Sequence, residues 1–354
     1  MELPPESSRT TPVLLLHGWL GGAHTFAALP TLLNSIKHVV LPSFLPYPTQ
    51  GRRITLEQLA DRLEQTLRAE AAWNGAPLTV LAHSMGTLVA RVWMRRHYLD
   101  RNLAPPVRLF IECGAPRHGV YLKRAARAMV RWGLVPGAGL AQAMLAPQPW
   151  LWDLTWAERA HEALLPPMYA LTSVLRRSNW LAPIVGGRDS DGIVPLACSQ
   201  PNPWFARPGA PAGRLRERPY RVLPDYAHSS HRGLLQHLRA DGSGHPIPPD
   251  DPVWALLRAA LRGEAWHEVP EHAPEAHANH ALWIVRHGAD DLRLEAGRIW
   301  APKGRHPSGL ALFAVPVAAG TEAVLRGGGK AWSAAELGLT DAWRAGAVAY
   351  VDLA

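Results

Sequence analysis

The first two thirds of the chain carry continuous apolar runs rather than alternating apolar and polar positions. Such runs are typical of strands that are buried on both faces of a sheet. The runs lie at residues 12–17, 38–42, 78–82, 107–113, 181–185 and 220–223. We therefore predict that each of these segments is a buried strand.

Between these runs, apolar residues recur at helical spacing. The clearest pattern covers residues 55–71, where Thr55 can cap the helix and leucines repeat every three or four residues along one face. Helices are also expected at 87–97 and 253–261. Strands that alternate with helices predict a mostly parallel sheet with helices on both faces.

Two stretches depart from this alternation. Residues from 117 to about 179 are helical in pattern and rich in leucine, alanine and tryptophan, which indicates an insertion that covers a pocket. Beyond residue 263, short apolar runs at 281–285, 310–317 and 347–353 predict a small strand-rich module. The expected division is a first domain over 1–262 and a C-terminal module over 263–354.

The insertion carries a group of tryptophans that has two interpretations. These are Trp132, Trp150, Trp152 and Trp156. They suit a pocket for an acyl chain, because burying each methylene contributes about 0.8 kcal/mol. Ordinary packing of the insertion against the sheet explains them equally well.

Composition limits the range of functions. The chain has 354 residues, of which 47% are hydrophobic and 19% charged, so it can bury a large core. Its net charge of +8 is spread over the whole length, and the densest groups, Arg91 with Arg95 and Arg96, and 123–131, fall on expected helices. We interpret these groups as solvated helix faces and expect no nucleic-acid partner. Transient contact with an acidic lipid surface stays an open alternative.

Other whole-chain features indicate a cytoplasmic protein without a cofactor. Cys113 and Cys198 have no disulfide or metal-site spacing, and residues 1–12 lack the pattern of a secretory signal. The longest charge-free run, 133–152, has the length of a membrane span, but prolines and glycines interrupt it. The sequence leaves the oligomeric state open.

The strongest chemical signal is the motif A-H-S-M-G at residues 82–86, between an expected strand and an expected helix. A serine at such a sharp turn projects its hydroxyl away from the sheet, so Ser84 is the candidate nucleophile. The alternative is that Ser84 merely caps the helix. A second strand runs into H-G-W at 17–19, and we predict that the backbone amides of Trp19 and Met85 stabilise an oxyanion.

A serine nucleophile needs a base and an orienting carboxylate, and in this type of fold they follow it in the order acid, then histidine. The loop G-G-R-D-S-D-G-I-V-P at 186–195 offers Asp191, our choice, with Asp189 as the alternative. After the last expected strand, His231 stands before a helical run and is the predicted base. His228 is the alternative base.

These motifs together resemble those of bacterial lipases and esterases of the α/β-hydrolase superfamily. The shared elements are H-G-W (17–19), A-H-S-M-G (82–86), D-x-I-V (191–194) and H-x-G-L-L (231–235), in one order over residues 12–261. The resemblance implies an α/β-hydrolase fold with a helical lid insertion and a small C-terminal strand-rich module. It also implies the triad Ser84, Asp191 and His231.

The leading functional hypothesis is hydrolysis of carboxylic esters, on lipid or medium-to-long acyl substrates. The same triad could serve an acyltransferase or thioesterase, since both form an acyl-enzyme. A non-catalytic binding protein of the same fold is the third alternative. The motif R-H-G at 286–288 resembles a phosphate-binding motif of histidine phosphatases, but too few residues follow it to build such a domain.

Overall fold

A computed structural model describes most of the chain. It covers residues 11–36, 38–41, 54–70, 73, 75–121, 124–175, 189–229, 233–238, 250–267, 269–273, 277–278, 280–296, 299–300, 302–316, 322–340 and 346–354. The predicted strand at 181–185 lies outside these ranges.

Six strands of the described chain form an all-parallel sheet in the order β2-β1-β3-β4-β5-β8. They are β1 (Pro12–Leu16), β2 (Val39–Val40), β3 (Leu78–His83), β4 (Val107–Cys113), β5 (Met168–Val174) and β8 (Tyr220–Pro224). In β1, Val13 and Leu15 pack into one core cluster while Leu14 and Leu16 pack into another, so both faces are buried. This double burial explains the continuous apolar runs in the sequence.

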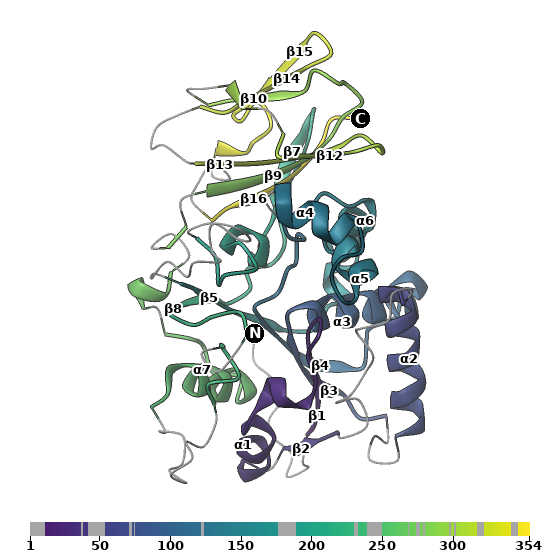
Figure 1. Cartoon of the computed structure of the whole chain (residues 1–354), viewed down its shortest axis with the longest axis vertical. Helices are drawn as coiled ribbons and strands as arrows, with labels where there is room; N and C mark the ends of the chain where they lie inside the picture. Colours follow the sequence, from purple (N-terminus) through teal and green to yellow (C-terminus); the bar gives the residue numbers. More distant parts are fainter. Residues whose placement is uncertain are drawn as a thin grey trace.

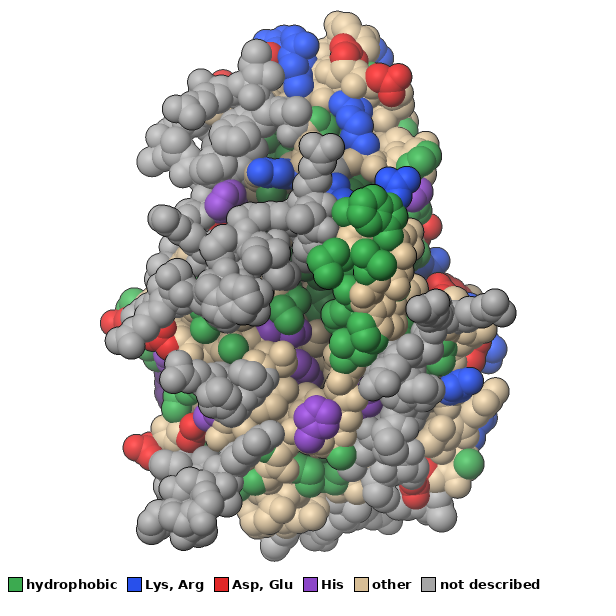
Figure 2. Space-filling view, viewed as in Figure 1, with side chains coloured by type: hydrophobic (Ala, Val, Ile, Leu, Met, Phe, Trp, Pro, Cys, Tyr) green, Lys and Arg blue, Asp and Glu red, His purple; other side chains and the backbone are tan. Residues whose placement is uncertain are grey.

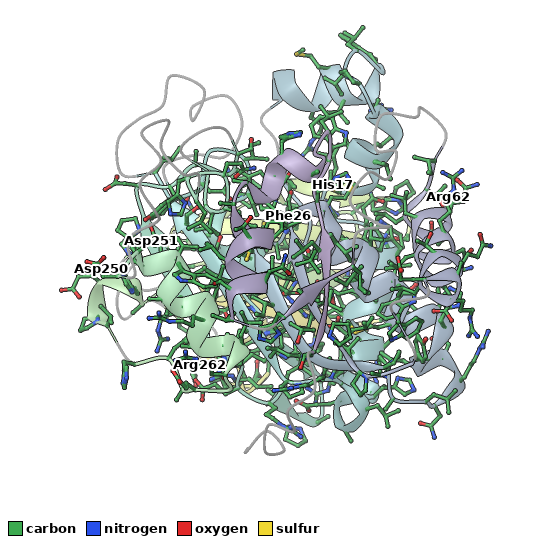
Figure 3. The ribbon with its side chains drawn as sticks, turned by 90° about the horizontal axis from the view of Figure 1, so that it is seen from below. His17, Phe26, Arg62, Asp250, Asp251 and Arg262 are labelled. Carbon is green, nitrogen blue, oxygen red and sulfur yellow. The ribbon has the colours of Figure 1, made fainter. Side chains whose placement is uncertain are left out.

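Helices cover both faces of this sheet. They are α1 (Leu29–Ser35), α2 (Leu56–Ala69), α3 (Met85–His97) and α7 (Pro252–Leu261). Side chains of α2 and α3 pack into one core cluster, and those of α1 and α7 pack into the other. Figure 3 shows α7, between Asp251 and Arg262, and α2, which carries Arg62, on opposite sides of the molecule.

The predicted helix at 55–71 is confirmed together with its cap. The Thr55 side chain accepts a hydrogen bond from the amide of Gln58 at 3.2 Å, and the Thr55 amide donates to Oε1 of Gln58 at 3.0 Å. This reciprocal pair satisfies two amides that the first helical turn leaves without acceptors.

The insertion between β4 and β5 is helical, as predicted, but shorter than predicted. It contains α4 (Arg124–Arg131), α5 (Ala138–Ala143) and α6 (Pro149–Ala160). The expected range, about 117–179, was wrong at its end because residues 168–174 form β5, a buried strand of the central sheet. No helix in the described ranges combines the length and the hydrophobicity that crossing a bilayer requires.

The C-terminal region adds two further sheets, which lie at the top of Figure 1. One has the order β12-β13-β9-β16-β6-β7 and the other β11-β10-β14-β15. Their strands are β6 (Trp204–Arg207), β7 (Ala210–Arg214), β9 (His280–Arg286), β10 (Arg293–Glu295), β11 (Ile299–Trp300), β12 (Gly304–His306), β13 (Leu310–Pro316), β14 (Val324–Gly327), β15 (Lys330–Ser333) and β16 (Val348–Asp352).

The hairpin β6–β7 lies in the part of the chain that we predicted to belong to the first domain. Its strand β6 nevertheless pairs with β16 of the C-terminal region. Side chains of the insertion also reach this sheet, since Trp156 packs edge-on against Phe205 and Trp152 contacts Tyr350. The strand-rich region is therefore joined to the α/β part by both a hairpin and a packed aromatic interface.

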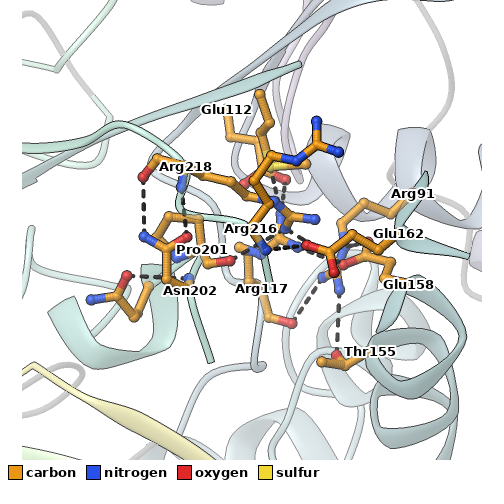
Figure 4. Close-up of polar contacts among 12 residues, drawn as sticks. Arg91, Glu112, Arg117, Thr155, Glu158, Glu162, Pro201, Asn202, Arg216 and Arg218 are labelled. Atoms are coloured by element: carbon orange, nitrogen blue, oxygen red, sulfur yellow. Dashed lines mark hydrogen bonds and ion pairs between the residues drawn. The ribbon is translucent and has the colours of Figure 1, made fainter. Parts of the chain in front are cut away.

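A buried group of charged side chains joins α3, α6 and the end of β4 (Figure 4). Arg117 donates to Glu112 and to Glu158, both at 2.6 Å, and Arg91 donates to Glu158 at 2.6 Å. All four side chains are at most 2% exposed. The expectation that Arg91 belongs to a solvated helix face is thus wrong, because α3 is packed under α6 at that point.

The two guanidinium groups keep Glu158 ionised. Burial alone would raise the pKa of its carboxyl, but the charges of Arg91 and Arg117 lower that pKa to about 2. The ionised carboxylate in turn compensates two cations that have no access to water.

Replacing Glu158 by Gln leaves these cations without one of their counter-charges. We expect the free energy of unfolding at pH 7 to fall by about 3–5 kcal/mol, as measured by urea denaturation. Because the folded pKa lies below the ordinary value of 4.5, the wild-type advantage is complete above that pH and declines as the pH falls toward 2.

The control is Asp100→Asn, which breaks an ion pair with Arg95 in which the Asp100 side chain is 47% exposed. Its cost should stay below about 1 kcal/mol. Equal losses in the two variants would contradict the structural role given to Glu158.

Candidate active site

Ser84 sits at a tight turn between β3 and α3. Its backbone has φ 53° and ψ −127°, a conformation that is strained for any residue except glycine. The Ser84 amide donates to the carbonyl of Cys113 at 2.9 Å, which ties the turn to β4. A Cβ on Gly86 would lie 2.4 Å from the Leu16 carbonyl oxygen, so only glycine lets α3 pass this close to β1.

The imidazole of His228, which follows β8, contacts two other candidate residues. Its Nε2 lies 2.7 Å from Oγ of Ser84, and its Nδ1 lies 2.7 Å from Oδ2 of Asp191. The geometry fits one tautomer, in which Nδ1–H donates to the carboxylate and Nε2 accepts from the serine hydroxyl. All three residues are buried.

Asp191 is fixed by the loop that carries it. Its Oδ1 accepts hydrogen bonds from the amides of Ile193 at 3.0 Å and Val194 at 2.8 Å, which leaves Oδ2 for His228. The Asp191 carbonyl also accepts from the His228 amide at 2.8 Å. The two loops are therefore held together by both backbone and side chain.

Asp189, the alternative acid, points elsewhere. Its Oδ2 lies 2.8 Å from Nδ1 of His280 at the start of β9. Asp189 thus contacts the C-terminal sheet, and of the two candidate acids the one at hydrogen-bond distance from His228 is Asp191.

The predicted base, His231, lies outside the described residues. The position that a base requires, in reach of both Ser84 and Asp191, is occupied by His228, the alternative. The choice of His231 relied on a helical run after it, but residues 234–237 form turns. The segment after β8 brings the imidazole of His228 to Ser84, so the described geometry favours His228, the alternative, as the candidate base, and His231 stays untested.

His83, inside the serine motif, has a role that the sequence did not reveal. Its Nε2 donates to the backbone carbonyl of His228 at 2.9 Å. Burial, together with the neighbouring His228, lowers the pKa of His83 to about 3, so its ring stays neutral. A neutral, buried donor here holds the loop of His228 against the turn of Ser84.

A pocket of about 360 Å³ opens beside Ser84 and His228. Of the two predicted oxyanion donors, Trp19 lines the pocket. Met85 follows Ser84 as the first residue of α3, so its amide has no acceptor within the helix. The remaining lining residues are Gly18, Leu20, Gly21, His24, Thr25, His83, Pro116, Val120, Met144, Ile193, Val194, Ser229 and Gln236.

The tryptophans of the insertion do not line this pocket. Trp152 and Trp156 pack on Phe205 and Tyr350 of the C-terminal sheet, and the indole N–H of Trp150 donates to the carbonyl of Ala143. The packing interpretation therefore holds for these three. The insertion contributes Val120 and Met144 to the pocket instead.

The location of the pocket follows from the order of the strands. The chain runs from β1 out to β2 and then crosses back to place β3 on the other side of β1. In open α/β sheets such a reversal leaves a crevice at the carboxyl ends of the two strands. Trp19 follows β1 and Ser84 follows β3, so both residues fall at this crevice.

The motif at 286–288 does not form a phosphate site of its own. The Arg286 guanidinium donates to both carboxylate oxygens of Asp352, at 2.8 and 2.5 Å. This pairing joins neighbouring strands β9 and β16 and explains the arginine as part of the sheet.

Comparison with known proteins shows that the chain has the α/β-hydrolase fold, and a family model described as the α/β-hydrolase fold matches residues 11–108. Phospholipase PlaB from Legionella pneumophila has a similar structure, with a TM-score of 0.74, 14% identity, and coverage of 97% of this chain and 93% of PlaB. The complex of PlaB with thio-NAD gives a TM-score of 0.73 at 15% identity, with the same coverage.

A lipase from Bacillus licheniformis, BlEst2 in its mature form, is 11% identical, with a TM-score of 0.41 and coverage of 64% of this chain and 89% of the lipase. No curated protein matches the chain by sequence.

The approach of Gly18 to Ser84 yields a specific expectation. A Cβ on Gly18 would lie 2.7 Å from Cβ of Ser84, closer than two such atoms can approach. Gly18→Ala must therefore displace the serine, and a shift of about 1 Å can lower a rate about 100-fold. We expect a loss of this size in the rate at which a fluorophosphonate probe labels the protein.

Gly288→Ala is the matched control, because no atom lies within 4 Å of the Cβ it would add. Its labelling rate should equal that of the wild type. A Gly18→Ala protein that folds and reacts at the wild-type rate would contradict the close contact.

Proposed function

We propose that the chain is a serine hydrolase that cleaves carboxylic ester bonds through an acyl-enzyme on Ser84. The observation that carries this proposal is the pair of 2.7 Å contacts from the His228 imidazole to Oγ of Ser84 and Oδ2 of Asp191. Such a linked nucleophile, base and acid beside a pocket is the arrangement that acyl transfer requires.

The proposed chemistry proceeds in two steps. In the first, Oγ of Ser84 attacks the ester carbonyl carbon while its proton passes to Nε2 of His228, which then delivers that proton to the departing alcohol. In the second, a water molecule attacks the acyl-enzyme, gives its proton to the same nitrogen, and releases the acid with Ser84 restored. Asp191 stabilises the imidazolium in both steps.

Negative charge forms on the carbonyl oxygen during each attack. The amides of Trp19 and Met85 are the proposed donors to this oxygen, since Trp19 lines the same pocket as Ser84 and Met85 follows Ser84 as the first residue of α3. The positive end of the α3 dipole adds to the stabilisation at this point.

The lining of the pocket favours an acyl chain as the group bound beside Ser84. Val120, Met144, Ile193 and Val194 contribute apolar side chains, and few charged groups reach this space. The likeness in fold to a phospholipase agrees with a lipid ester as substrate. We therefore propose lipid or medium-to-long acyl esters as the substrate class.

The triad is tested by comparing two nearby histidines. His228→Ala and Ser84→Ala should each lower kcat/KM for a nitrophenyl ester by about 10⁴-fold or more. His231→Ala, three residues further along the chain, should stay near the wild-type value. The reverse result, with activity lost at His231 and kept at His228, would overturn the assignment, and an unreactive wild-type Ser84 would favour a binding protein.

The substrate class is tested with nitrophenyl esters of increasing chain length. Each further buried methylene contributes about 0.8 kcal/mol, so kcat/KM should rise by about fourfold per added methylene until the pocket is filled. A preference confined to acetate would contradict the acyl pocket. Product analysis with added alcohols would show transfer in place of hydrolysis if an ester of the alcohol formed.

A further inference from the structure

Exposed hydrophobic side chains concentrate in one short segment of the insertion. Among the described residues, the large hydrophobic side chains that are exposed include Met129 at 48%, Trp132 at 72% and Leu134 at 64%. All three fall within six residues at the end of α4. Figure 2 shows hydrophobic side chains gathered on this face of the molecule, over the region of α4 and α5.

The local backbone holds these side chains in place. The Trp132 amide donates to the Ala128 carbonyl and the Leu134 amide donates to the Met129 carbonyl, both at 2.9 Å. Val130, in the same helix, is only 6% exposed and is therefore buried. The apolar group is therefore a formed surface and not the loose end of a helix.

The charged residues in and around this segment are all basic. Residues 118–152 contain Lys123, Arg124, Arg127 and Arg131 but neither aspartate nor glutamate. Of the arginines whose side chains are described, Arg131 is exposed and Arg127 is half-buried. A solvated helix face, the expectation from sequence, accounts for the arginines but not for a tryptophan that is largely in water.

The exposed segment is linked to the pocket. α4 is followed by α5 and then by Met144, which lines the pocket, and the insertion begins near Val120, which also lines it. Leu20, on the neighbouring loop, lines the pocket and is itself 36% exposed. A surface that contacted α4 would thus lie next to the pocket.

We propose that residues 124–134, the interfacial segment, dock the protein on the surface of an anionic lipid bilayer. Met129, Trp132 and Leu134 enter the region between headgroups and acyl chains, while Arg127 and Arg131 pair with lipid phosphates. Tryptophan is favoured at this depth because its ring is amphipathic. The docking itself is independent of catalysis, and its use for presenting lipid esters to the pocket rests on the proposed function.

The test is co-sedimentation of the full chain with vesicles of phosphatidylcholine, with and without phosphatidylglycerol. The wild type should bind the anionic vesicles more tightly, and added salt should weaken this binding. Arg127→Gln with Arg131→Gln should lower the partition coefficient on anionic vesicles about 30-fold, at about 5-fold for each charge. It should leave binding to phosphatidylcholine unchanged.

The apolar part of the segment is tested by Met129→Ser, Trp132→Ser and Leu134→Ser combined, which should lower binding to both kinds of vesicle by more than about 10-fold. The matched controls lie outside the segment: Leu103→Ser, at a leucine that is 53% exposed, and Arg62→Gln with Arg101→Gln, both exposed. These variants should bind as the wild type does.

Failure of docking and failure of catalysis give different results. Ser84→Ala should bind vesicles like the wild type, and the interfacial variants should keep the wild-type rate on a short, soluble nitrophenyl ester. Absence of wild-type binding to either vesicle, or equal losses in the segment and control variants, would overturn the proposal. The proposal would also be overturned if the wild type formed a dimer, bound no vesicles, and became a monomer in the triple variant. The segment would then contact a second copy of the chain instead of a bilayer.

Discussion

The whole site depends on one imidazole that meets two partners at once. His228 can accept from Ser84 only while Asp191 holds its other nitrogen, and Asp191 can do so only while the amides of Ile193 and Val194 hold its second oxygen. Each contact sits in a buried environment, where hydrogen bonds to charged groups are stronger and their loss is more costly. The loops that follow β3, β5 and β8 must therefore keep their relative positions to within a fraction of an ångström.

Contacts elsewhere in the fold help to hold these loops in position. The Arg117 side chain anchors the turn after β4 to Glu112 and Glu158. The C-terminal sheet contacts the neighbouring chain through Asp189 with His280 and through His118 with the Tyr350 hydroxyl, among other contacts. These contacts join the C-terminal strands to the part of the chain that carries the site.

Much of this was predictable from sequence because the signals were local. Buried strands gave continuous apolar runs, Thr55 capped the predicted helix, and Ser84 stood between a strand and a helix. The errors concern contacts between distant residues: β5 was taken as part of a helical insertion, and Arg91 as solvated, because the partners that bury them are remote in sequence. The choice between His228 and His231 likewise depends on a distance in three dimensions, which the order of residues in the sequence does not give.

The most direct measurement is a crystal structure of the protein after reaction with an alkyl fluorophosphonate. We expect phosphorus bonded to Oγ of Ser84, His228 Nε2 close by, and one phosphonate oxygen about 2.7–3.1 Å from the amides of both Trp19 and Met85. An adduct on another residue, or an oxygen that faces solvent away from both amides, would contradict this expectation.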